Sequence, residues 1–160
     1  MNSFTLVDGS HLIKEEKKDA ITLLIFLAKK RGGRIKVIAC ADGRGQRVKF
    51  EKEDAAYPKF AIEIIFITSV IDAHEGCDVA IITIPGAFLH ADSYEHIIMV
   101  FKGKLTLLMC NVEPKLYMKN IIFDKGGKPV LYFKMLKAIY GLLKGAFLFY
   151  HKLVKNLQKN

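Results

Sequence analysis

The residues of this chain that could hold a metal ion or act as nucleophiles do not follow a familiar spacing. His74-Glu75 begins like the zinc-binding pattern His-Glu-x-x-His, but Asp78 stands where the second histidine would have to be. A disulfide framework or a zinc site needs an even set of cysteines or close pairs. The cysteines here are three and far apart: Cys40, Cys77 and Cys110. The sequence therefore argues against zinc chemistry, and we expect free thiols.

Positive charge is the strongest chemical feature of the sequence. The formal net charge is +9, and such a chain attracts polyanions through its long-range potential and through counterion release. Most of the basic residues gather in clusters: Lys14, Lys17 and Lys18; Lys29, Lys30, Arg31, Arg34 and Lys36; Arg44, Arg47, Lys49 and Lys52; and Lys134, Lys137, Lys144, Lys152, Lys155 and Lys159. Clustering around a Gly-rich turn favours a nucleic-acid partner, and merely solvated surface charge is the alternative.

The composition is that of one ordinary globular domain. The chain has 160 residues, and its hydrophobic fraction of 51% is too high for wholesale disorder. Its longest apolar runs, at 21–28 and 62–73, are shorter than the roughly 18–20 residues that span a bilayer. The N-terminus lacks the basic region and apolar core of a signal peptide. We therefore expect an intracellular chain that is neither secreted nor inserted in a membrane.

The largest basic cluster surrounds the turn of a predicted β-hairpin. Residues 21–30 and 35–41 are rich in β-forming side chains, and the sequence RGGR at 31–34 separates them. A short polar helix is predicted before this hairpin, from Ser10 as its N-cap to Ala20. The basic stretch that follows Asp42-Gly43, up to Asp54, is predicted to be a loop.

A buried helix and a buried strand are predicted next. Pro58 precedes an apolar run that we interpret as a largely buried helix from about Lys59 to His74, with Gly76 as its left-handed cap. The following sequence CDVAIITI, at 77–84, is a short and nearly continuous apolar run. This pattern is typical of a central strand buried on both faces, and Pro85-Gly86 ends it.

Shorter elements are predicted in the second half of the chain. We expect a polar loop at 89–95, a short strand at 97–101, a helix at 105–116 that Pro114 ends, and a second hairpin around the sequence KGGK at 125–128. An amphipathic helix is predicted at the C-terminus, and its apolar stripe is interpreted as core packing. The stripe consists of Leu143, Phe147, Tyr150, Val154 and Leu157. Helices and strands alternate irregularly, which predicts a mixed α and β fold.

Four of these segments, taken in order, resemble the reverse transcriptase domain of copia-type retrotransposon polyproteins. They read RGGRIKVIACADGRGQR, YPKFAIEIIFITSVIDAHEG, DVAIITIPGAFLHAD and KAIYGLLKGAFLFYHKL. In that family the third segment contains Asp-Val-Lys-x-Ala-Phe-Leu or Asp-Ile-Pro-x-Ala-Phe-Leu, and the fourth contains Lys-x-Leu-Tyr-Gly-Leu. The resemblance covers roughly residues 11 to 158, which is almost the whole chain.

The resemblance implies an α+β fold, the fingers and part of the palm of a right-hand polymerase. Residues 1–160 would then form a single, truncated reverse transcriptase domain. A fingers-like basic hairpin and loop would occupy about 11–58, and a partial palm with the C-terminal helix about 59–160. In the intact family, three aspartates hold two Mg²⁺ ions that activate the primer 3′ hydroxyl and stabilise the leaving pyrophosphate.

This sequence departs from the family at those aspartates. Aligned on the sequence IPGAFL at 84–89, the first aspartate position is occupied by Thr83, whose neutral hydroxyl is a weak ligand. Asp78 lies five residues upstream, and residues an odd number apart point to opposite faces of a strand. Asp92 lies beyond the turn at Pro85-Gly86. The paired aspartates of the family follow the Tyr-Gly segment, and the sequence ends at Asn160 before them. We therefore expect no Mg²⁺ to bind well in this chain.

Other family positions are retained in part. The resemblance implies that Lys36 lies near the phosphates of an incoming nucleotide, while Ile38 replaces a common arginine. Phe88 matches the aromatic residue under the incoming sugar, and a core aromatic is its alternative interpretation. Lys144 and Phe147 stand where glutamine and arginine are common. The expected nucleic-acid contacts are Arg31, Arg34, Arg44 and Arg47.

Three functional hypotheses follow from these residues. The first is a fragment of a retrotransposon RNA-directed DNA polymerase that is catalytically inactive. The second is a basic nucleic-acid-binding module that keeps a surface for an RNA template or an RNA–DNA hybrid. The third is part of a larger polyprotein that supplies the missing aspartates, and Thr83 argues against it because it lies inside the chain. Exposed strand edges of an incomplete palm also predict self-association.

Overall fold

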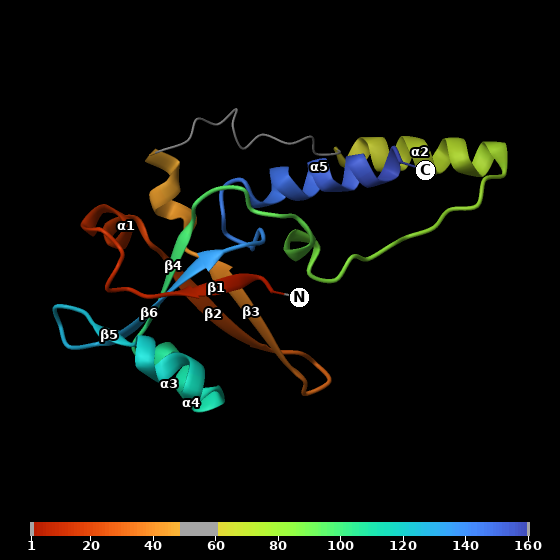
Figure 1. Cartoon of the computed structure of the whole chain (residues 1–160). Helices are drawn as coiled ribbons and strands as arrows, with labels where there is room; N and C mark the ends of the chain where they lie inside the picture. The colour runs from red at the N-terminus through yellow and green to blue at the C-terminus, as the bar shows by residue number, and fades with distance from the viewer. Residues whose placement is uncertain (1, 49–60, 160) are drawn as a thin grey trace.

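A mixed sheet organises the chain in the computed structural model, which describes residues 2–48 and 61–159 (Figure 1). Within those residues the sheet has the strand order β1-β6-β4-β2-β3, and β5 also pairs with β6. All of its pairings are antiparallel except the one between β2 and β4. The strands are β1 (Phe4–Val7), β2 (Ile21–Lys29), β3 (Ile35–Ala41), β4 (Ile98–Lys102), β5 (Ile122–Phe123) and β6 (Pro129–Met135).

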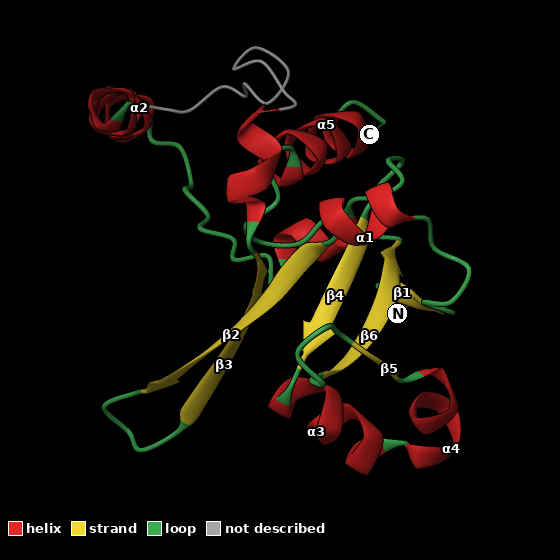
Figure 2. Ribbon diagram, turned by 90° about the vertical axis from the view of Figure 1, so that its left-hand side faces the viewer, coloured by secondary structure: helices red, strands yellow, loops and turns green. Residues whose placement is uncertain are grey.

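In Figure 2, α1 and α5 lie at one end of this sheet and α3 and α4 at the other, while α2 lies apart. The α-helices are α1 (Lys14–Asp19), α2 (Ile62–Glu75), α3 (Lys104–Val112), α4 (Pro114–Tyr117) and α5 (Gly145–Leu157). Short 3₁₀-helices are η1 (Gly43–Val48), η3 (Ala87–His90) and η4 (Met118–Asn120). The chain is thus a mixed α and β structure, as the sequence predicts.

The β2–β3 hairpin is long and regular, which confirms the sequence prediction. Its register runs from Leu23 opposite Ala41 to Lys29 opposite Ile35. The turn is closed by two backbone hydrogen bonds of 2.9 Å each, in which the N–H of Lys30 donates to Arg34 and the N–H of Gly33 donates to Lys30. Gly33 has φ of 77°, a conformation that glycine adopts at no steric cost. The second Gly-Gly turn, between β5 and β6, is confirmed in the same way.

Three hydrophobic clusters of the described residues pack on the sheet, two on one face and one on the other. Opposed residues of paired strands share a face, so the register places Met99, Phe133 and Leu131 on one side. This first face packs against α3 and α4 through Cys110 and Tyr117. The second face carries one cluster, which Leu12, just before α1, helps to cover. Its other buried members are Ile98, Val100, Val130 and Tyr132.

The helix predicted to start at Ser10 begins later, at Lys14. Ser10 instead bonds backward, because its N–H and its hydroxyl both donate to the carboxylate of Asp8, at 2.8 and 2.7 Å. The first turn of α1 is held by Glu16, whose carboxylate accepts the N–H of Ile13 at 3.0 Å. Prediction of Ser10 as the N-cap was therefore wrong, because its side chain formed a competing local turn.

The helix predicted at 59–74 forms as α2, but it is not buried. Gly76 ends α2 in the left-handed conformation, with φ of 68°, as the sequence predicts. Lys59 lies outside the described residues, and none of the residues of α2 is buried. Figures 1 and 2 show α2 lying apart from the sheet. A helix with apolar residues on all sides is normally buried. The helix does form here, but no described element covers it.

The central strand predicted at 77–84 is absent, since these residues form an extended but unpaired segment. Ile81 and Ile82 are 95% and 82% exposed. A strand buried on both faces needs a neighbour on each side, and in the described sheet β4 already has β2 and β6 as its neighbours. The central positions of the described sheet are therefore occupied by β2, β4 and β6, and not by residues 77–84.

Of the loop predicted after Asp42-Gly43, residues 43–48 form η1 instead, and residues 49–54 lie outside the described residues. The predicted elements of the second half form with shifted bounds. The predicted strand at 97–101 is β4, and the predicted C-terminal helix is α5. The interpretation of its apolar stripe as core packing was wrong, because none of the residues of the stripe is buried and Leu157 is 68% exposed. The predicted polar loop at 89–95 starts within η3, which ends at His90. Pro114 does not simply end a helix; it begins α4, because a proline at the first helical position lacks only an N–H that would be unpaired anyway.

Candidate nucleic-acid interface

The tip of the β2–β3 hairpin carries the most concentrated positive charge of the described residues. Arg31 and Arg34 flank the two turn glycines, and both side chains are exposed. Lys29 and Lys30 precede them at the end of β2. Within residues 2–48 and 61–159, these four side chains form no ion pair or hydrogen bond with a carboxylate. Their charges are therefore available to an external polyanion.

Lys36 extends this basic surface along β3. It lies opposite Ala28 in the hairpin register, so it shares a face with Phe26 and Ile38. The side chain is exposed. An exposed cation beside an exposed aromatic ring, here the 53% exposed Phe26, is a combination found on surfaces that hold single-stranded nucleic acid.

Arg44 and Arg47 lie on η1, which follows β3 directly. Arg44 forms a two-point ion pair with Asp42, from Nε to Oδ1 at 2.7 Å and from Nη2 to Oδ2 at 2.6 Å. These hydrogen bonds hold the pKa of Asp42 below its usual range and raise that of Arg44. The charge of Arg44 is thus largely compensated, while Arg47 is exposed. Of the two, Arg47 is the better candidate for a phosphate contact.

Two glycines fix η1 against the second half of the chain. The N–H of Ala41 donates to the carbonyl of Tyr140 at 2.7 Å, and a Cβ on Gly43 would overlap the carbonyl oxygen of Gly141. Gly141 in turn has φ of 89°, and a Cβ there would overlap the carbonyl oxygen of Ala41. The Tyr140-Gly141 segment, which the resemblance singles out, therefore packs against the base of the hairpin and stabilises it.

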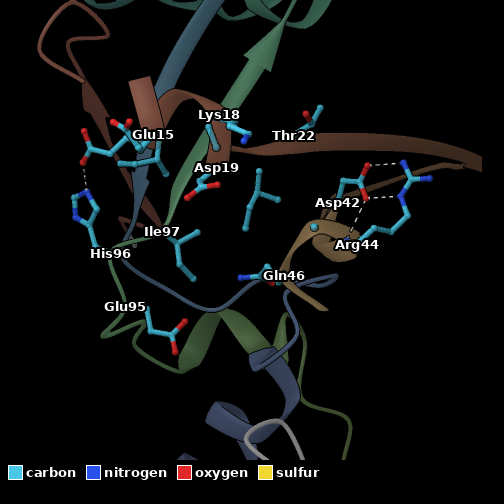
Figure 3. Close-up of a pocket in the computed structure, with 15 residues that line it drawn as sticks. Glu15, Lys18, Asp19, Thr22, Asp42, Arg44, Gln46, Glu95, His96 and Ile97 are labelled. Carbon is cyan, nitrogen blue, oxygen red and sulfur yellow. Dashed lines mark hydrogen bonds and ion pairs between the residues drawn. The ribbon is translucent and has the colours of Figure 1, made fainter. Parts of the chain in front are cut away.

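A cleft of about 770 Å³ opens beside η1 (Figure 3). Its walls come from α1, the start of β2, η1 and the segment leading into β4, and its lining includes five carboxylates: Glu15, Glu16, Asp19, Asp42 and Glu95. Gln46 is buried at its base, and its Oε1 accepts the N–H of Leu143 at 3.0 Å. Among the described residues of the lining, the only lysine and arginine are Lys18 and Arg44. The cleft is therefore unsuited to a phosphate backbone.

Several carboxylates of the cleft already have partners. Glu95 accepts a hydrogen bond from Lys144 at 2.8 Å, and Glu16 lies 3.0 Å from the imidazole of His96. These pairs connect segments that are far apart in the sequence. They stabilise the cleft walls and leave the basic hairpin as the surface suited to polyanions.

The resemblance places Phe88 and Lys36 at the same nucleotide. Among the described residues, no hydrogen bond or ring contact joins these two side chains. Phe88 lies on η3, half buried against Tyr140 and Phe149, with ring centroids 4.4 and 6.1 Å away. This is the packing environment of a core aromatic, the alternative that the sequence left open. A role for Phe88 at a nucleotide stays a prediction.

The residues around Thr83 do not build a two-metal site. Thr83 is exposed within the unpaired segment 77–84, and Asp78 is exposed in the same segment. Asp92 is engaged by Lys137, whose hydrogen bond lowers the pKa of Asp92. The described residues contain no group of three or more His, Cys, Asp or Glu side chains that could hold a metal ion. The residues present do not fit the Mg²⁺ pair that the resemblance implies.

Sequence reasoning found the basic hairpin but missed the cleft and the Asp42–Arg44 pair. The pair could have been found from the spacing D-x-R after a strand, which places a carboxylate and a guanidinium at one turn. The cleft offered no such signal, because its walls come from four segments spread over more than 80 residues.

Comparisons of the chain with protein-family models, with curated proteins and with solved structures found no match. No helix within residues 2–48 and 61–159 is long and apolar enough to cross a membrane.

Proposed function

We propose that this chain is a catalytically inactive fragment of a copia-type reverse transcriptase that binds nucleic acid through its basic hairpin. The observation that carries the proposal is the hairpin tip, where Lys29, Lys30, Arg31 and Arg34 lie together without a carboxylate partner among the described residues. The family assignment rests on the collinear sequence segments, and the polymerase fold is part of the proposal.

The loss of catalysis is supported by the residues that should hold the metals. Thr83 replaces the first aspartate, and it lies in an exposed segment rather than a buried strand. Transfer of a nucleotide by two Mg²⁺ ions needs several carboxylate oxygens that converge on the cations. Primer extension by the purified chain, with Mg²⁺ and with Mn²⁺, is expected to give no product. Templated synthesis above background would overturn this part of the proposal.

Binding is tested with fluorescently labelled single-stranded RNA and with an RNA–DNA hybrid. The double substitution Arg31→Ala with Arg34→Ala removes two charges from the hairpin tip. We expect it to weaken binding about tenfold or more, because several adjacent cations act together on one phosphate backbone.

The second Gly-Gly turn of the chain provides a matched control. Lys125→Ala with Lys128→Ala removes the same net charge from an equally exposed turn between β5 and β6. We expect this control variant to bind within about twofold of the parent. Equal losses in the two variants would mean that the chain binds through its overall charge, and that the hairpin is not an interface.

A further inference from the structure

The segment of residues 61–84, which we call the acidic segment, exposes an unusual amount of apolar surface. It contains α2 and the unpaired stretch after it. Its exposed large apolar residues range from 38% exposure at Ile84 to 95% at Ile81. They are Ile62, Ile64, Ile65, Phe66, Ile67, Val70, Ile71, Val79, Ile81, Ile82 and Ile84. Together, over all sides of α2 and of the stretch after it, they present on the order of 1,000 Å², so even one side approaches the roughly 300–600 Å² of the largest apolar patch on a typical monomer.

A second apolar surface lies on the β2–β3 hairpin. Ile25, Leu27, Ile35 and Val37 share one face of it, because each strand alternates and Leu27 is opposite Val37. Their exposed fractions are 43%, 71%, 70% and 61%. The same face is covered farther in, where Leu23 packs into the core. The outer half of this face, which we call the docking face, is therefore a continuation of the core that nothing in the described chain covers. Lys36 points to the opposite side.

The two surfaces carry opposite charges. The acidic segment contains Glu63, Asp72, Glu75 and Asp78 and has no lysine or arginine. The hairpin, residues 21–41, has no aspartate or glutamate and contains Lys29, Lys30, Arg31, Arg34 and Lys36. Complementary charge of this kind orients partners and excludes wrong pairings. Each surface thus suits the other in polarity and in charge.

We propose that a second copy of this chain covers both surfaces, with the acidic segment of each copy packed on the docking face of the other. Such a reciprocal arrangement closes around a two-fold axis. Each copy would contribute one side of its acidic segment and also its docking face, and the two contacts together would approach the roughly 800 Å² per partner of a standard stable interface. In both views α2 lies well away from the hairpin of its own chain (Figures 1 and 2). Because the acidic segment lacks basic residues, it does not suit an anionic membrane surface.

The proposal is tested by exchanging the charges of the two surfaces in the full chain. One variant carries Lys29→Glu, Lys30→Glu and Arg34→Glu on the hairpin. The other carries Glu63→Lys, Glu75→Lys and Asp78→Lys on the acidic segment. All six residues are exposed, so circular dichroism is expected to match the parent.

Sedimentation velocity then gives the state of association. We expect the parent to dimerise, each variant alone to dimerise at least tenfold more weakly, and an equimolar mixture of the two to form a heterodimer. The mixture restores opposite charges at both contacts. Monomers in the mixture, a parent that stays monomeric at about 100 µM, or variants that dimerise as tightly as the parent would overturn the proposal. Docking of the acidic segment on the hairpin of its own chain predicts the second of these results, a parent that stays monomeric.

A second pair of variants separates the two faces of the hairpin. Leu27→Asp places a charge on the docking face, and Phe26→Asp places the same charge on the opposite face one residue away. We expect Leu27→Asp to weaken dimerisation at least tenfold and Phe26→Asp to leave it within about threefold. Equal effects would also contradict the proposal. Because dimerisation is measured without nucleic acid, its failure is distinct from failure of the proposed nucleic-acid binding.

Discussion

Replacement of Gly141 by alanine is expected to destabilise the chain by about 3 kcal/mol or more. The backbone of Gly141 is in the left-handed region, with φ of 89°, where a residue with a Cβ loses roughly 1–2 kcal/mol. The new Cβ would also overlap the carbonyl oxygen of Ala41 and lie 3.0 Å from its carbon and nitrogen. Since these are backbone atoms, β3 and the Tyr140 segment must separate.

That separation has its own cost. It lengthens the 2.7 Å hydrogen bond from the N–H of Ala41 to the carbonyl of Tyr140. A buried donor left without its partner costs about 1–3 kcal/mol, and Ala41 is only 4% exposed. For a chain of this size, the combined loss corresponds to a fall in melting temperature of about 6–12 °C.

Two other glycines separate the cost of the left-handed backbone from the cost of the steric overlap. A Cβ on Gly33 would meet nothing within 4 Å, although φ is 77°, so Gly33→Ala is expected to show the conformational cost alone, about 1 kcal/mol. A Cβ on Gly45 also meets nothing, and φ there is not in the left-handed region, so Gly45→Ala is expected to change stability by less than about 0.5 kcal/mol. Urea unfolding of the three variants measures the series. If Gly141→Ala loses no more than Gly33→Ala, the contact between β3 and the Tyr140 segment is not structural, and the reasoning fails.

Three further variants test the core, the response to acid and the interface. Leu131, which is 0% exposed, should lose about 2–5 kcal/mol in urea unfolding on substitution by alanine. The hydrogen bond from Lys137 lowers the pKa of Asp92 below 3.8, so this pair stabilises the fold above that pH and is lost as pH falls through the lower folded pKa. Between pH 7 and 3, Asp92→Asn should therefore lose less stability than the parent, as followed by thermal melting. In binding to single-stranded RNA, removal of Arg31 and Arg34 should make the slope of log affinity against log salt shallower by about 1.4, since each phosphate contact contributes about 0.7.

Local features of the sequence determined several elements of this protein. The β2–β3 hairpin follows from two β-rich runs and a Gly-Gly turn, and Gly33 provides the positive φ that the turn needs. The end of α2 follows from Gly76 in the same way. Hydrogen bonds between neighbouring residues decide these features, and neighbouring residues are what a sequence pattern describes.

Only the tertiary structure decided which of these elements are buried. The sequence predicts burial of residues 59–74 and 77–84 from their apolar character, yet α2 is exposed and Ile81 is 95% exposed. Burial requires a vacant place beside other elements, and the places next to β4 belong to β2 and β6. The same reason applies to Thr83. The identity of residue 83 could be read from the sequence. Whether residue 83 lies in a paired strand depends on which segments, distant in the chain, pair to form the sheet.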